Sequence, residues 1–98
     1  MSTTFIARLV VRKGMEAEFE RLQEELSKLS HPPHEPDTIV YDVIKHRTEP
    51  STYVVYARFT SEEAFQTHMK SHAHERLVPG ILASLASDMD LQFFDWIA

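Results

Sequence analysis

The hydrophobic period of this chain switches several times between the two-residue repeat of a strand and the longer repeat of a helix. Residues 3–12 contain six apolar residues, and the segment closes at Lys13 and Gly14, which predicts a strand. From Met15 to Leu29 the apolar residues lie three or four positions apart, and glutamates fill many of the positions between them. This spacing predicts one amphipathic helix, because residues three or four apart share a helix face.

A proline-rich stretch separates that helix from two further strands. Residues 30–37 contain three prolines, which remove backbone donors and exclude a helix, so a solvated loop is expected. Residues 38–46 and 52–59 are rich in β-branched and aromatic side chains, with a short polar turn between them. These two segments predict an antiparallel hairpin.

A second helix is expected to begin at Thr60, because Thr60 and Glu63 have the spacing of a capping box. Apolar residues at helical spacing extend it over residues 60–77. Pro79 and Gly80 are expected to break or restart it, since proline lacks the amide donor and glycine lowers helix propensity. A further helical turn or two follows.

Residues 89–97 close the chain as a fourth strand, so the order of elements is β-α-β-β-α-β. This order predicts a ferredoxin-like α+β fold, with a four-stranded antiparallel sheet and both helices on one face. The chain, residues 1–98, is expected to form a single domain, because a second hydrophobic core could not be built from so few residues.

Both faces of this sheet are expected to be apolar. In the first strand, Phe5 and Leu9 point to one face. Ile6 and Val10 point to the opposite face together with Arg8, and the third strand repeats this pattern. Two helices cover only one face. We therefore expect a homodimer in which the uncovered faces pack together.

The composition excludes several classes of partner. Fifteen acidic residues against ten Lys and Arg give a net charge of -5, and no segment clusters basic side chains, so neither nucleic acid nor an anionic membrane is expected as a partner. The absence of cysteine excludes disulfides, iron–sulfur clusters and thiolate zinc sites. No signal peptide or membrane-spanning run is visible, so a soluble cytoplasmic protein is expected.

Several runs of the sequence resemble the antibiotic biosynthesis monooxygenase family. The runs that carry the resemblance are Ala7-Arg8 leading to Lys13-Gly14, Tyr41-Asp42-Val43, residues 53–59, and residues 61–71 with the histidine that follows. The resemblance covers nearly the whole chain. The resemblance implies a dimeric α+β barrel that oxygenates an electron-rich aromatic molecule without flavin, haem or metal.

The activity implied by the resemblance is that of a cofactor-independent monooxygenase, acting with O2 on a quinol-like or polycyclic aromatic substrate. Such a protein has to supply a base, stabilise the substrate anion and exclude water. Ile6 falls where haem-degrading relatives carry an asparagine, so haem is not expected as a cofactor. The alternative is a non-catalytic dimer of the same fold that binds a small ligand or acts in a stress response.

Three histidines, His68, His72 and His74, form the densest cluster of candidate bases. The resemblance places a pocket histidine soon after Ser71, which makes His74 the first candidate and His72 the second. His68 and His72 have the spacing that places two side chains on one helix face. A metal site would need a third ligand such as Glu75, and no metal is expected. The remaining alternative leaves all three histidines in solvent.

Arginines and aromatic side chains complete the candidate site. Arg58, and otherwise Arg8, is expected to stabilise a substrate anion; the alternative is that each pairs with an acid in the sheet or across a dimer interface. Some strand aromatics are expected to line a flat slot, although most belong to the core. The residues assigned to substrate binding are Phe59, Tyr56, Trp96, His68 and Arg8.

Overall fold

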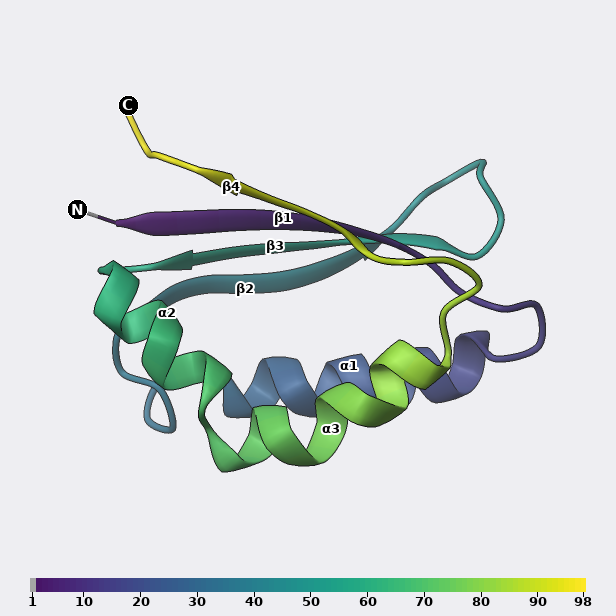
Figure 1. Ribbon diagram of the computed structural model, residues 1–98, viewed down its shortest axis with the longest axis horizontal. Helices are drawn as coiled ribbons and strands as arrows, with labels where there is room; N and C mark the ends of the chain where they lie inside the picture. Colours follow the sequence, from purple (N-terminus) through teal and green to yellow (C-terminus); the bar gives the residue numbers. More distant parts are fainter. Residues whose placement is uncertain (1) are drawn as a thin grey trace.

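The computed structural model describes residues 2–98 and confirms the predicted α+β, ferredoxin-like architecture (Figure 1). The sheet has four strands in the order β2-β3-β1-β4, and every neighbouring pair is antiparallel. The elements in chain order are β1 (Thr3–Val10), α1 (Glu16–Leu29), β2 (Thr38–Lys45), β3 (Thr52–Phe59), α2 (Glu62–Met69), α3 (His72–Ala83) and β4 (Asp90–Phe94).

All three helices lie on one side of the sheet (Figure 1). The strand alternation predicted from the sequence is confirmed, because Phe5, Ala7 and Leu9 of β1 are buried in the core. Ile6 and Arg8 point to the other face and are exposed. The helices therefore form a second layer over one face, and the opposite face of the sheet is uncovered in the single chain.

The apolar face of α1 holds this helix against the sheet. Phe19, Leu22 and Leu26 are buried, and the ring of Phe19 packs on Tyr53 of β3 with 4.6 Å between the ring centroids. Gln23 is buried on the same face. A polar side chain thus enters the interior from a helix that is otherwise packed through apolar contacts.

The second helical region differs from the sequence prediction at its start and at its break. Ser61, and not Thr60, caps α2, because Ser61 Oγ accepts a hydrogen bond from the amide of Ala64 at 3.1 Å. The helix then ends at Met69. Ser71 caps α3 in the same way, its Oγ accepting from the amide of His74 at 3.1 Å.

The predicted break at Pro79 and Gly80 is wrong, since both residues lie inside α3. Proline has no amide hydrogen, so the carbonyl of Glu75 loses its helical hydrogen-bond donor at Pro79. Both residues are exposed, so water can donate to this carbonyl instead. A Cβ atom at Gly80 would lie 3.0 Å from Cδ1 of Leu22. The glycine therefore permits a close approach between α3 and α1.

The last strand is shorter than predicted. β4 covers Asp90–Phe94 and pairs with β1 at the edge of the sheet. Residues 95–98, of which the prediction included three, continue past the strand. Among residues 2–98, no helix has the length and apolar character needed to cross a membrane.

Replacing Ser71 by alanine is expected to lower the free energy of unfolding by about 1 kcal/mol, because the first turn of α3 loses the acceptor for the amide of His74. Ser87→Ala is the matched control, since Ser87 is exposed and lies outside the helices and strands. Urea denaturation of both variants measures the difference. Equal unfolding free energies would contradict a stabilising role for this cap.

Candidate functional site

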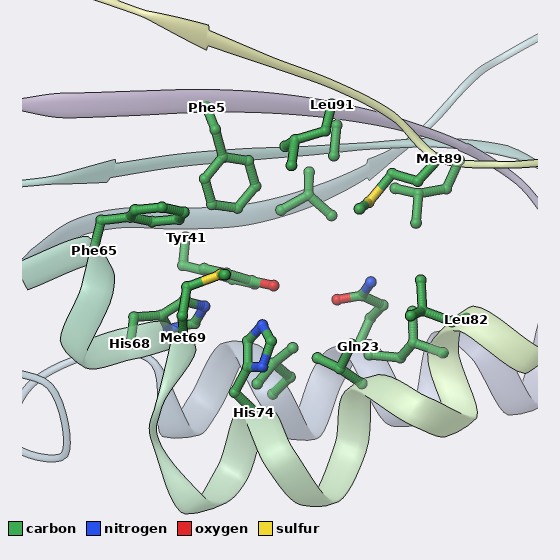
Figure 2. A pocket seen from close by; sticks show the side chains of 16 residues that line it. Phe5, Gln23, Tyr41, Phe65, His68, Met69, His74, Leu82, Met89 and Leu91 are labelled. Atoms are coloured by element: carbon green, nitrogen blue, oxygen red, sulfur yellow. The ribbon is translucent and has the colours of Figure 1, made fainter. Parts of the chain in front are cut away.

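A cavity of about 90 Å³ lies between the sheet and the helices (Figure 2). All four strands and all three helices contribute lining residues, most of them apolar. Ala7 and Val55, which are paired at the centre of the sheet, are small residues beneath the cavity, and they leave space that larger side chains would fill.

The mouth of the cavity is apolar as well. Four lining side chains are both part of the cavity wall and exposed to solvent, namely Met69, Leu82, Met89 and Leu91. They belong to α2, α3, β4 and the segment that precedes β4. The cavity therefore opens between the α2–α3 region and the β4 edge of the sheet.

Four polar side chains line this largely apolar space, those of Gln23, Tyr41, His68 and His74. Gln23 of α1, Tyr41 of β2 and His74 of α3 line the cavity, and Figure 2 shows their polar ends directed toward the same region. Gln23 and Tyr41 are each 4% exposed, whereas His74 is partly buried. The Gln23 Oε1 atom is buried and has no hydrogen-bond partner among residues 2–98.

The surroundings of Tyr41 and His74 keep both side chains neutral near pH 7. Burial raises the pKa of Tyr41, and the nearby Glu35 carboxylate raises it further. Burial lowers the pKa of His74 below its ordinary value of 6.5; the charge of His68 lowers it further, and Glu35 opposes both effects. Tyr41 therefore offers a hydroxyl donor, and His74 offers a neutral imidazole that can accept a proton.

A partly buried carboxylate holds the neighbouring histidine in place. Glu35 Oε1 lies 2.9 Å from Nδ1 of His68, and the two side chains are 12% and 2% exposed. Because an ionised carboxylate only accepts hydrogen bonds, Nδ1 of His68 carries the proton in this pair. Thr38 Oγ1 donates to the same Glu35 oxygen at 3.2 Å. The proline-rich loop thus supplies a charged group to the site.

The ring of His68 is fixed by aromatic contacts. It packs against Tyr41 and Phe59 with centroid separations of 5.5 and 5.1 Å. The ring of His74 meets it edge-on, with 5.2 Å between the centroids. His68, which is bound to Glu35, therefore lies next to His74 on the α2 side of the cavity.

The structure brings together only part of the set of residues predicted from the sequence. His74 and His68 both line the cavity. Phe59 is fully buried behind His68 and does not reach the cavity. His72 is exposed and lines a separate surface groove together with His34 and Glu35.

The prediction that His68 and His72 share one helix face is wrong, because α2 ends at Met69 before α3 begins at His72. In the described part of the chain, no group of three or more histidine, aspartate or glutamate side chains is arranged to bind a metal ion.

The remaining predicted residues, Arg8, Tyr56, Arg58 and Trp96, lie on the opposite side of the sheet from the cavity. The strand alternation turns Arg8 and Arg58 away from the helices. Arg8 forms an exposed ion pair with Glu49, with 3.0 Å between Nη2 and Oε2. The Arg58 guanidinium stacks on the ring of Trp96, 3.9 Å from its centroid. Neither arginine can reach a molecule inside the cavity.

Sequence reasoning missed Gln23 and Glu35 as site residues. Gln23 had a detectable signal, because Phe19, Leu22, Gln23 and Leu26 follow the i, i+3, i+4, i+7 spacing of a buried helix face. A polar residue on such a face marks an interior polar group. Glu35 had none, since it lies in a proline-rich loop and its partner His68 is 33 positions away.

The fold is shared with solved structures of low sequence identity. A candidate antibiotic biosynthesis monooxygenase from Caulobacter crescentus CB15 has a TM-score of 0.92 at 22% identity, covering 99% of this chain and 91% of that one. Rv0793 from Mycobacterium tuberculosis has a TM-score of 0.91 at 15% identity, covering 100% and 97%. SnoaB, a cofactor-independent oxygenase from Streptomyces nogalater, has a TM-score of 0.83 at 20% identity, covering 97% and 92%.

No protein with curated annotation is similar to the sequence at a significant level. The sequence model of one family, antibiotic biosynthesis monooxygenase, matches residues 3–80. This range contains all the polar residues of the cavity, including Gln23, Tyr41 and His74. The chain therefore belongs to the antibiotic biosynthesis monooxygenase family.

Proposed function

We propose that this protein is a cofactor-independent monooxygenase that binds a quinol-like aromatic molecule in the cavity and oxygenates it with O2. The observation that carries the proposal is the convergence of His74, Tyr41 and Gln23 in an otherwise apolar cavity. Family membership and the structural similarity to SnoaB, a cofactor-independent oxygenase, support it.

The chemistry begins with removal of a proton from a phenolic hydroxyl. His74, neutral near pH 7, accepts this proton, and the Tyr41 hydroxyl donates a hydrogen bond to the resulting phenolate oxygen. The electron-rich anion then reduces O2. One oxygen atom enters the ring and the other leaves as water, so that a hydroquinone yields a hydroxyquinone and His74 returns its proton to the departing oxygen.

The Glu35 carboxylate assists the base electrostatically. Its negative charge raises the pKa of His74 against the effect of burial, so it stabilises the imidazolium that forms when His74 takes a proton. Arg58 and Arg8 were expected to stabilise the substrate anion, and in this proposal Tyr41 takes that role. The apolar walls exclude water from the anion while it reacts with O2.

A homodimer forms the second part of the proposal. The face of the sheet away from the helices exposes apolar side chains, among them Ile6 at 36%, Ile44 at 59% and Trp96 at 49%. The Nε atom of Arg58 on this face is buried and has no hydrogen-bond partner among the described residues. A second copy of the chain would cover this apolar face and offer acceptors to Arg58.

Oxygen uptake tests the assignment of the base. The wild-type protein is mixed in air with simple hydroquinones or with anthrone, and it is expected to consume O2 with at least one of them. His74→Ala is expected to lower the rate by roughly 100-fold, because the proton acceptor is lost. His72→Ala is the matched control in the same helix and should keep the rate. Equal rates for the two variants would contradict the proposal, and ligand binding without any O2 uptake would favour the non-catalytic alternative.

The pH dependence of the rate tests the link between Glu35 and His74. The rate is expected to rise as His74 loses its proton, with a midpoint below the ordinary pKa of 6.5, and to level off above it. Glu35→Gln removes the charge that raises this pKa, so the midpoint is expected to move to lower pH. Rate profiles between about pH 5 and pH 8 measure the midpoints. Glu49→Gln, on the Arg8 ion pair, is the control; a Glu35→Gln midpoint equal to or above the control's would count against this link.

Light scattering during size-exclusion chromatography tests the dimer. The wild-type protein is expected to have twice the mass of one chain. Ile6→Glu places a charge in the middle of the exposed sheet face and is expected to give monomers, because an unpaired charge is costly to bury. Ala17→Glu, on the exposed side of α1, should remain dimeric. A monomeric wild-type protein would overturn this part of the proposal.

A further inference from the structure

We propose that Gln23 selects the substrate, and that the substrate is a single-ring hydroquinone with an apolar substituent that extends through the mouth of the cavity. In this arrangement one hydroxyl meets His74 and Tyr41, and the second meets the amide of Gln23. The inference rests on the proposed function and narrows its range of quinol-like and polycyclic molecules to one class.

The buried amide oxygen of Gln23 has no hydrogen-bond partner among the described residues. The side chain is 4% exposed. Burial of such a group without a partner is unfavourable, and few groups of this kind persist in native proteins. A ligand hydroxyl both donates and accepts hydrogen bonds, so it would satisfy the amide in either rotamer.

The position of Gln23 relative to the base favours a ligand with two hydroxyls. Figure 2 shows Gln23 across the cavity from His68, with its amide facing the polar ends of Tyr41 and His74. The three groups come from α1, β2 and α3, so they approach the space from different walls. A ring held between them presents one hydroxyl to His74 and Tyr41 and the opposite one to Gln23. This arrangement favours a 1,4-diol over a molecule with one hydroxyl.

The cavity is small. Its volume is about 90 Å³. Apolar cavities that hold benzene have a volume of about 150 Å³. This cavity is smaller than that, so a single ring fits only when the flexible side chains of Met69 and Met89 move aside at its mouth. The three fused rings of an anthrone would displace the buried walls.

Apolar side chains form the mouth of the cavity. Met69, Leu82 and Leu91 line the cavity and are 45%, 48% and 40% exposed. Exposed apolar side chains that gather at a cavity entrance mark a surface for an apolar group. A substituent on the ring would lie against them and remove their surface from water.

Anaerobic titration calorimetry tests this inference, because it measures binding without turnover. The ligands are tert-butylhydroquinone, the two tert-butylphenols that each lack one of its hydroxyls, unsubstituted hydroquinone, and anthrone. The wild-type protein is expected to bind the diol roughly tenfold more tightly than either monophenol, since each loses a hydrogen bond to a buried group. It should bind hydroquinone and anthrone more weakly than the substituted diol.

The diol preference of the Gln23→Leu variant, compared with that of a control variant, tests the role of Gln23. This variant keeps an apolar side chain at the position and removes the amide, so the preference for the diol over the monophenol that lacks the Gln23-facing hydroxyl is expected to vanish. Gln66→Leu, an exposed glutamine of α2 given the same change, should keep it. Gln23→Met, which is unbranched and of similar length, replaces Gln23→Leu if the latter does not fold.

Three results would overturn the inference: equal binding of diol and monophenols by the wild-type protein, a diol preference in Gln23→Leu as large as in Gln66→Leu, or tighter binding of anthrone than of the diol. The proposed function fails separately. A diol preference that depends on Gln23, together with no O2 uptake in air, would support the binding assignment and contradict the oxygenase.

Discussion

The structure depends on the burial of one face of a strongly apolar sheet by three helices. Strand alternation places Phe5 and Leu9 under the helices and leaves Ile6 on the other side. The covered face supplies the hydrophobic core and, where Ala7 and Val55 leave space, the cavity. The uncovered face supplies the apolar surface that we assign to a second copy of the chain. The proposed site and interface thus lie on opposite sides of one sheet.

The cavity is largely apolar, and its surroundings set the protonation states of its polar groups. Burial keeps the hydroxyl of Tyr41 protonated and the imidazole of His74 unprotonated near pH 7. The Glu35 carboxylate is bound to His68, next to His74, and stabilises positive charge on the base without entering the cavity. The arrangement favours proton removal from a neutral substrate.

Much of the fold could be predicted from the sequence, because strands and α1 bury their side chains with regular periods. The break between α2 and α3 could not, since it depends on whether Ser71 caps a new helix, while Pro79 is tolerated at an exposed position. The candidate site was predicted only at the histidines. Arg8 and Arg58 could stabilise an anion, but they alternate with the buried residues of their strands. This alternation alone could have placed both on the uncovered face of the sheet. The contact between Glu35 and His68 depends on how the proline-rich loop folds back onto α2, which local sequence does not encode.

The central claim is that the convergence of His74, Tyr41 and Gln23 forms a binding site for one aromatic ring. A crystal structure of the protein soaked with tert-butylhydroquinone under nitrogen tests it most directly. The account predicts electron density for the ring between Gln23 and Tyr41, with one hydroxyl within hydrogen-bond distance of the His74 imidazole. A ring bound elsewhere, or an interior in which side chains fill the cavity and these three polar groups bond to one another, would contradict it.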